Sequence, residues 1–198
     1  SADADARERA KAFYTRIIKP LVGYAVPVIQ LSRSTDHAGI GSIFAHANSV
    51  GLQMDVFELL TAKFATEDPT FRLQDDWEKT EKILRAYPAL AEIDRTDFLT
   101  SVALYVTAKN GHASAFRESI IELTLDEYRP AADTMRLAFH EAANFMAHRC
   151  IITTSQVPYS AQLVPLAVIV ALLAERPGVL SQQQAWDRIH QWFWCGVC

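Results

Sequence analysis

The sequence predicts a mainly α-helical fold, a multi-helix bundle with one small β element. Half of the 198 residues are hydrophobic and 21% are charged, which is enough apolar material to bury a substantial core. Through most of the chain the apolar residues recur three and four positions apart, the spacing of a helix with one buried face. The stretch YAVPVIQL, Tyr24 to Leu31, is short and rich in Val and Ile, which is typical of a strand.

Helices are expected along almost the whole chain, and several begin at a capping residue. Asp55 with Glu58, and Thr124 with Glu127, have the spacing of a capping box, in which two side chains satisfy the first free amides of a helix. The expected helices lie at residues 5–21, 36–47, 74–87, 125–149 and 159–175, with three more that start after Asp55, Thr96 and Ser181.

The expected strand lacks a clear partner. A lone strand leaves its backbone groups unpaired, and Cys150 to Thr154 is only a weak second candidate. Partner strands belong to a segment outside this chain or to another subunit, or YAVPVIQL is not a strand. We therefore divide the chain into residues 1–34, an N-terminal helix and strand, and residues 35–198, a helical domain.

Charge and cysteine content narrow the class of protein. The net charge of -4 and the lack of a Lys/Arg cluster give no electrostatic footprint for nucleic acid. Three cysteines argue against a disulfide framework and suit a reducing compartment. The N-terminus lacks the apolar core of a signal peptide, and the longest apolar run, residues 163–174, is shorter than the ~20 residues of a membrane span. We expect a cytoplasmic protein with no membrane partner.

The thiols and histidines make no strong metal motif. Cys195-Gly-Val-Cys198 has the spacing of a zinc or redox pair, but no second CxxC or HxxxH accompanies it. We therefore favour two cysteines without a joint role. His140 and His148 are eight residues apart, too far for one metal ion, and are expected to be packed or solvated.

The acidic pair Asp75-Asp76 precedes Trp77 in the first turn of an expected helix. Acids there interact favourably with the helix dipole, and metal binding is the alternative. No cofactor follows from these residues.

The C-terminal stretch AWDRIHQWFWC is rich in tryptophan. Its aromatics at helical spacing are read as core, with a partner-binding patch as the alternative. Trp194 falls outside the stripe that Trp186, Ile189 and Trp192-Phe193 form. We expect Trp194 to be exposed or to contact another segment.

Three stretches together resemble one family. They are VPVIQL with the downstream FAHANSVGLQMDVFELLTAKF, then VPYSAQLVPLAVIVALL, and finally IHQWFWCGV. The pattern is similar to that of the GmrS-like family, large bacterial proteins with a ParB/sulfiredoxin-like N-terminal domain. Members include the GmrS half of GmrSD restriction systems, which attack modified phage DNA. The family motif, roughly F-x-x-x-N-x-G-G-x-x-L-x-x-x-E-L, is echoed by Phe44, Asn48, Gly51, Leu52, Glu58 and Leu59.

The resemblance implies a candidate ligand-binding set of Asn48, Gly51 and Glu58. The turn from Asn48 to Gly51 is the candidate ligand-facing loop, and a plain corner between two helices is the alternative. Val50 stands where the family has its first glycine, so a Cβ occupies a place where a phosphate could approach the backbone.

The chain resembles an internal piece of such a protein. Residues 1–34 would be the end of the ParB-like domain, and the DGQQR-type motif that the family links to nucleotide hydrolysis is missing. We expect a non-catalytic or incomplete portion that acts as a helical scaffold or binding module, and meets nucleotide or DNA through a missing or partner domain.

Two alternatives stay open. The first is a nucleotide hydrolase or nuclease active on its own, built on the carboxylates of Asp55, Glu58, Asp75 and Asp76. The second is a stand-alone helical interaction protein, a homodimer that pairs residues 26–31 across subunits.

Overall fold

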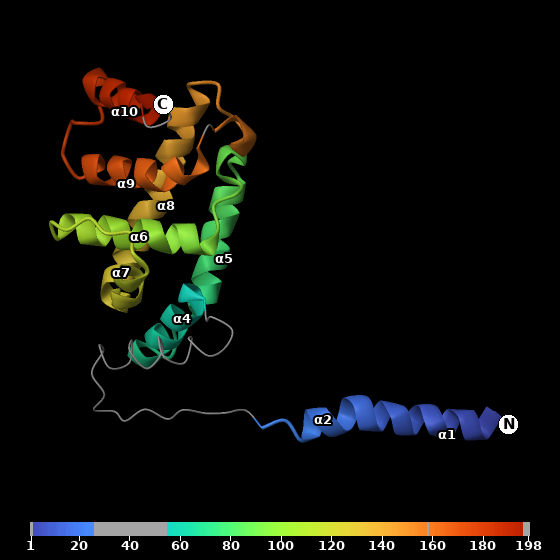
Figure 1. The fold of residues 1–198 in the computed structure, drawn as a ribbon. Coiled ribbons are helices and arrows are strands. Elements are labelled where there is room, and N and C mark those ends of the chain that lie inside the picture. Colours follow the sequence, from blue (N-terminus) through green and yellow to red (C-terminus); the bar gives the residue numbers. More distant parts are fainter. Residues whose placement is uncertain (1, 26–54, 158, 196–198) are drawn as a thin grey trace. The chain divides into compact units, whose positions relative to one another are not determined.

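The computed structural model describes residues 2–25, 55–157 and 159–195. The chain divides into two compact units, Ser1–Ala47 and Asn48–Cys198, which we treat separately as unit 1 and unit 2. Within the described ranges all regular structure is helical, so the main expectation of an α fold is confirmed (Figure 1). The boundary between residues 34 and 35 stays a prediction.

Unit 1 contains a continuous helix that agrees with the one expected over residues 5–21. It consists of α1 (Ala2–Phe13), a π-helical segment (Tyr14–Ile18) and α2 (Lys19–Val22). The Lys19 amide donates to the Tyr14 carbonyl, five residues back, which is the wider π turn. Pro20 cannot donate a hydrogen bond and its ring crowds the preceding turn, so a local widening of the helix just before it is physically reasonable.

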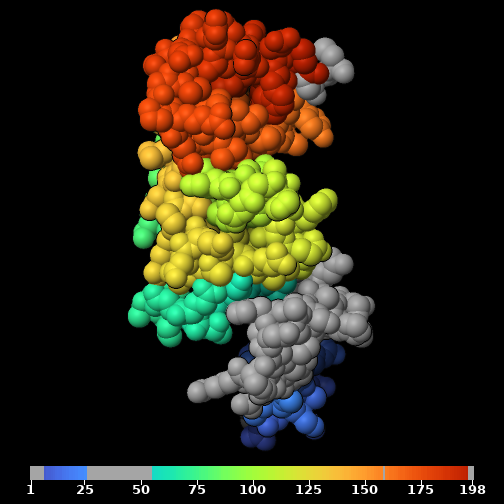
Figure 2. All heavy atoms as spheres, turned by 90° about the vertical axis from the view of Figure 1, so that its left-hand side faces the viewer, coloured from blue at the N-terminus to red at the C-terminus, as the bar shows by residue number. Residues whose placement is uncertain are grey.

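Unit 2 is a bundle of seven α-helices among its described residues. They are α4 (Val56–Glu67), α5 (Leu73–Arg85), α6 (Arg95–Lys109), α7 (Arg117–Glu122), α8 (Leu125–Ala147), α9 (Leu163–Ala174) and α10 (Gln183–Cys195). Short 3₁₀ turns lie at Pro88–Leu90, Thr154–Gln156 and Ser160–Gln162. Figure 2 shows α10 and α9 at one end of this unit, α6 and α8 in the middle and α4 at the other end.

The core of unit 2 is centred on α9. Its sequence LVPLAVIVALLA has no charged residue, and it packs against both α8 and α6. Leu166 and Ala167 are fully buried there, as are Phe139 and Met135 on α8. One cluster of buried side chains runs from Val56 on α4 to Phe193 on α10. Unit 2 therefore has a single hydrophobic core. No helix within the described ranges is long and apolar enough to cross a membrane.

Both predicted capping boxes are confirmed, whereas α6 and α10 begin at other residues than expected. Asp55 caps α4 and Thr124 caps α8, each with its expected glutamate three residues on. Helix α6 is capped by Asp94 rather than Thr96, because Asp94 accepts hydrogen bonds from two amides, those of residues 96 and 97, at 2.7 and 2.8 Å. Helix α10 begins at Gln183, two residues after the expected Ser181 cap.

The small β element is not found in the described part of the chain. Of the strand expected at Tyr24 to Leu31, all but the first two residues lie outside the described ranges, and those two are irregular. The weaker candidate, Cys150 to Thr154, is wrong. It holds the last residue of the turn that follows α8, then irregular backbone and the first residue of a 3₁₀ turn.

The residues after α8 are of types that favour strands, but their backbone forms a motif that ends a helix. The Ile151 amide donates to the Met146 carbonyl at 3.1 Å and the Cys150 amide to the Ala147 carbonyl at 3.0 Å. This pair of bonds, with Cys150 at φ 61°, is a Schellman motif, which reverses the chain at a helix end. The Gln156 side chain then accepts from the next amides, those of residues 152 and 153, at 2.7 and 3.0 Å. The amides that a strand would offer to a partner are thus already used.

Candidate functional site

The predicted ligand-binding set lies only partly within the described residues. Asn48 and Gly51 fall outside them, so the structure does not place the candidate loop. Glu58 is described, and its Oε2 accepts from the Asp55 amide at 3.2 Å, while Asp55 Oδ1 accepts from the Phe57 amide at 3.3 Å. The observed contact of Glu58 is thus a helix cap. Its role toward a ligand stays a prediction.

Asp55 also joins the start of α4 to the start of α6. Its Oδ2 lies 2.6 Å from a terminal nitrogen of Arg95. The Arg95 guanidinium also stacks over the Phe57 ring, 4.8 Å from its centroid. Asp55 and Arg95 therefore already have partners within the fold.

A partly buried polar network links α5 to α8 through Asp76. Asp76 Oδ2 accepts hydrogen bonds from the Tyr128 hydroxyl at 2.8 Å and from the Arg136 guanidinium, with which it forms an ion pair. Arg136 Nε donates to Thr80 Oγ1 at 2.9 Å, and Asp133 accepts from another guanidinium nitrogen. The side chains of Asp76 and Arg136 are only 16% and 13% exposed.

This network is satisfied internally. Burial raises the pKa of the Tyr128 phenol, and the negative charge of Asp76 raises it further, so the hydroxyl stays protonated and donates. A buried charge that lost its partner would be strongly disfavoured, so the Asp76–Arg136 pair holds the two helices in one register. Sequence reasoning missed this pair because its members are 60 residues apart.

A second polar junction connects α4 to the turn between α7 and α8. Lys63 Nζ donates to three successive carbonyls at the end of α7, those of Ile121 and Glu122 at 3.0 Å and Leu123 at 2.8 Å. Four residues along α4, Glu67 Oε2 accepts from the Leu125 amide at 2.7 Å, at the start of α8. Burial lowers the pKa of Lys63, against the opposing effect of nearby glutamates. Helix α4 thus places the positive charge of Lys63 at the C-terminus of α7 and the negative charge of Glu67 at the N-terminus of α8.

The arrangement nearest to acid–base chemistry is a chain of three side chains around His140. The Tyr87 hydroxyl is hydrogen-bonded to His140 Nδ1, and Asn144 Nδ2 lies 3.2 Å from His140 Nε2. The rings of Tyr87 and His140 meet edge to face, 5.3 Å apart. Both ring nitrogens therefore have partners within the fold, while the side chain is 43% exposed, in agreement with the expectation of a packed or solvated histidine. Within the described ranges, no group of three His, Cys, Asp or Glu side chains could hold a metal ion.

Two hollows on the described surface were considered as ligand sites, and neither encloses a ligand-sized space. One, of about 180 Å³, lies on unit 2 between the 3₁₀ turn at Ser160–Gln162 and residues Glu92 and Asp97. It is smaller than the ~300–1,000 Å³ of typical ligand pockets. Asp97, whose pKa is raised by burial, already accepts from the Asp94 amide at 3.2 Å.

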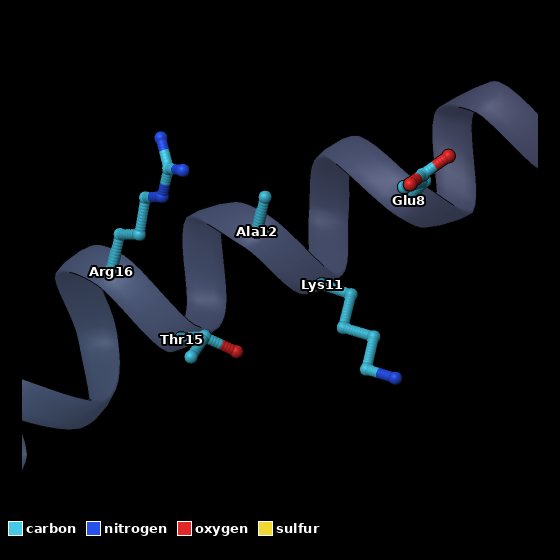
Figure 3. A pocket seen from close by; sticks show the side chains of 5 residues that line it. All are labelled: Glu8, Lys11, Ala12, Thr15 and Arg16. Carbon is cyan, nitrogen blue, oxygen red and sulfur yellow. The ribbon is translucent and has the colours of Figure 1, made fainter.

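The other hollow, of about 270 Å³, lies on unit 1 and is lined by a single helix. Figure 3 shows its side chains along one stretch of that helix, with Lys11 and Arg16 projecting to opposite sides. Side chains from one helix cannot surround a ligand, so this hollow is a surface feature of the helix.

The thiols and the C-terminal aromatics complete the candidate groups. Cys150 and Cys195 are free and exposed, and Cys198 lies outside the described residues.

On α10, Trp194 is 37% exposed, as predicted. Trp192, expected on the buried stripe, is 36% exposed, so that part of the expectation is wrong. The buried stripe of α10 is narrower than the sequence suggests and consists of Ile189 and Phe193.

Comparisons with known proteins add no relative. No family model matches the chain, and no curated protein and no solved structure matches it. The resemblance to the GmrS-like family therefore stays a prediction.

Proposed function

We propose that this chain is a helical scaffold or binding module, a non-catalytic or incomplete portion of a GmrS-like, restriction-associated bacterial protein. The observation that most supports this proposal is that the candidate carboxylates form hydrogen bonds within the fold. Asp76, the most buried acid of the predicted set, is bonded to Tyr128 and Arg136 and holds α5 to α8. Asp55 and Glu58 are bonded to the first turn of α4. These acids stabilise helix junctions, which is the work of a scaffold.

The test is complementation by an upstream fragment that carries the DGQQR-type motif. Nucleotide hydrolysis would be measured for that fragment alone, for this chain alone and for the mixture. We expect little turnover from this chain and a clear gain on mixing. The matched control is the same fragment with its motif mutated, which should give no gain. Equal rates with and without this chain would refute the proposal.

A binding site in the Asn48–Gly51 turn is tested separately. A thermal-shift screen against ATP, GTP, CTP and duplex DNA, with and without magnesium, detects any ligand that binds only the folded state. A ligand that raises the melting temperature by several degrees in the parent chain, but not in Asn48→Ala, would support the site. A shift unchanged by Asn48→Ala would assign the binding elsewhere.

The competing enzyme hypothesis makes the opposite prediction. If this chain hydrolyses nucleotides or cleaves DNA alone, Glu58→Gln should abolish turnover in a variant that still melts cooperatively. Because glutamine keeps a side-chain oxygen that can accept the same capping hydrogen bond, we expect that variant to lose no more than about 1 kcal/mol of stability.

A further inference from the structure

The helix of unit 1 presents an apolar stripe to solvent. Its apolar side chains recur at helical spacing, yet the structure leaves them exposed. The exposed fractions are 58% for Phe13, 59% for Tyr14, 46% for Ile17, 36% for Ile18 and 73% for Leu21. A stripe of this length is typical of a helix that binds a partner through its apolar face.

Basic residues border this stripe. Between residues 7 and 19 there are five basic side chains and one acidic one, Glu8. Figure 3 shows Lys11 and Arg16 leaving the helix on opposite sides. Helical spacing places one of them on each side of the arc that holds Phe13, Ile17 and Leu21. The remainder of the chain is acidic, because the whole carries a net charge of -4. Positive charge is thus concentrated on the same helix as the exposed apolar residues.

This combination points to an anionic lipid surface. We propose that the helix from Arg7 to Val22 lies along the surface of a membrane that contains anionic phospholipid, with Phe13, Ile17 and Leu21 in the headgroup–acyl boundary. Long basic side chains at the border of an apolar stripe can keep their stems in the apolar layer and their charges among lipid phosphates. The aromatic rings of Phe13 and Tyr14 suit the same interfacial depth.

Two other occupants fit the charges less well. A second copy packed on the stripe would bring two sets of basic edges together, and like charges across a helix pair are destabilising. Duplex nucleic acid would match the positive charge but would leave the apolar side chains without a partner. Anionic lipid satisfies both features.

The proposal concerns a helix on the surface and not a span. The longest apolar run of the sequence forms α9, whose side chains are mostly buried in unit 2. The expectation of no membrane partner depends on the length of that run and on the lack of a signal-peptide core at the N-terminus. Neither property bears on a helix that lies on a membrane surface. The inference is independent of the proposed function, because it uses only unit 1 and needs no GmrS-like partner.

Vesicle co-sedimentation of the full chain tests the inference. The vesicles are phosphatidylcholine alone, or phosphatidylcholine mixed with phosphatidylglycerol. We expect several-fold more protein in the pellet with the anionic vesicles. This excess should fall as salt is raised, since charges are screened over about 8 Å at physiological ionic strength.

Two variants separate the apolar and the charge contributions. Ile17→Glu should reduce vesicle binding on the order of tenfold, because it removes apolar burial and adds a charge of the wrong sign. Lys11→Glu with Arg16→Glu should abolish the preference for anionic vesicles. The control, Lys79→Glu with Lys82→Glu on α5, changes the net charge equally and should bind like the parent. Both helices are exposed at these positions, so folding should persist, as circular dichroism would verify.

Four outcomes would overturn the inference. One is no sedimentation with either vesicle, and another is equal binding to both that the charge variants leave unchanged. A third is a dimer in light scattering without lipid that Ile17→Glu dissociates, which would assign the stripe to a second copy. The last is retention on duplex DNA that the Lys11–Arg16 variant loses and Ile17→Glu keeps, together with no vesicle binding.

Discussion

At the residue scale, Cys150 has a backbone conformation that is unfavourable for a residue with a Cβ. It is exposed and lies at φ 61°, in the left-handed region that costs most residues about 1–2 kcal/mol. Glycine adopts this conformation without that cost but loses more chain entropy on folding. We expect Cys150→Gly to raise the free energy of unfolding by about 0.5–1 kcal/mol in urea titrations. Cys150→Ala, which retains a Cβ, should give no such gain, and an equal gain in both variants would contradict the explanation.

Asp68 gives a second residue-scale prediction, on pH. Hydrogen bonds from Thr70, and then from Arg129, lower its pKa from 3.8 to about 2. A carboxyl whose folded pKa is depressed stabilises the fold above its unfolded pKa, and this contribution is lost as the pH falls from about 4 to about 2. Asp68→Asn should therefore unfold at lower urea concentration than the parent at pH 6, and the difference should shrink below pH 4. A constant difference at every pH would contradict the titration of Asp68 as the cause.

At the element scale, α4 organises the turn between two later helices. Lys63 donates hydrogen bonds to three carbonyls at the end of α7, and these carbonyls would lose their charged donor in Lys63→Met. We expect a loss of about 1–3 kcal/mol in the free energy of unfolding, measured by denaturant titration. Lys79→Met, at an exposed lysine on α5, should stay within about 0.5 kcal/mol of the parent. Similar losses in both variants would show that the capping bonds contribute little.

At the scale of the whole unit, one continuous core implies cooperative unfolding of α4 to α10. Leu166 on α9 is fully buried between α6 and α8, so Leu166→Ala should cost about 2–5 kcal/mol. Far-ultraviolet circular dichroism and tryptophan fluorescence should shift together, because buried Trp77 on α5 and half-buried Trp186 on α10 both adjoin this core. Separate transitions for the two probes would show that the core is divided.

Local signals explain what could be predicted of this fold. The capping boxes at Asp55 and Thr124 involve residues three apart, and helical periodicity is similarly local, so both could be read from the sequence. In the turn after α8, Ile151 and Ile152 favour a strand by composition, whereas the Schellman hydrogen bonds from the Cys150 and Ile151 amides decide the structure. Composition does not reveal where a helix ends.

Contacts between distant residues could not be predicted. The sequence places Asp76 in the first turn of a helix, and only the packing of α5 on α8 brings it to Arg136, 60 residues away. Trp192 was placed on the buried stripe, whereas α10 is covered mainly at Ile189 and Phe193. Of the candidate site, only the capping contact of Glu58 can be compared with the structure, because the turn at Asn48 and Gly51 lies outside the described residues.

The contacts of Lys63 and Glu67 have a consequence for synthesis. Their partners follow 58 to 60 residues later in the chain. At the roughly 5–20 residues per second of translation, α4 waits about 3–12 s before the turn between α7 and α8 leaves the ribosome. During that interval its apolar face, with Leu60 and Phe64, has no α7 or α8 to cover it. The apolar face of α4 therefore needs chaperone protection in the nascent chain until α8 is complete.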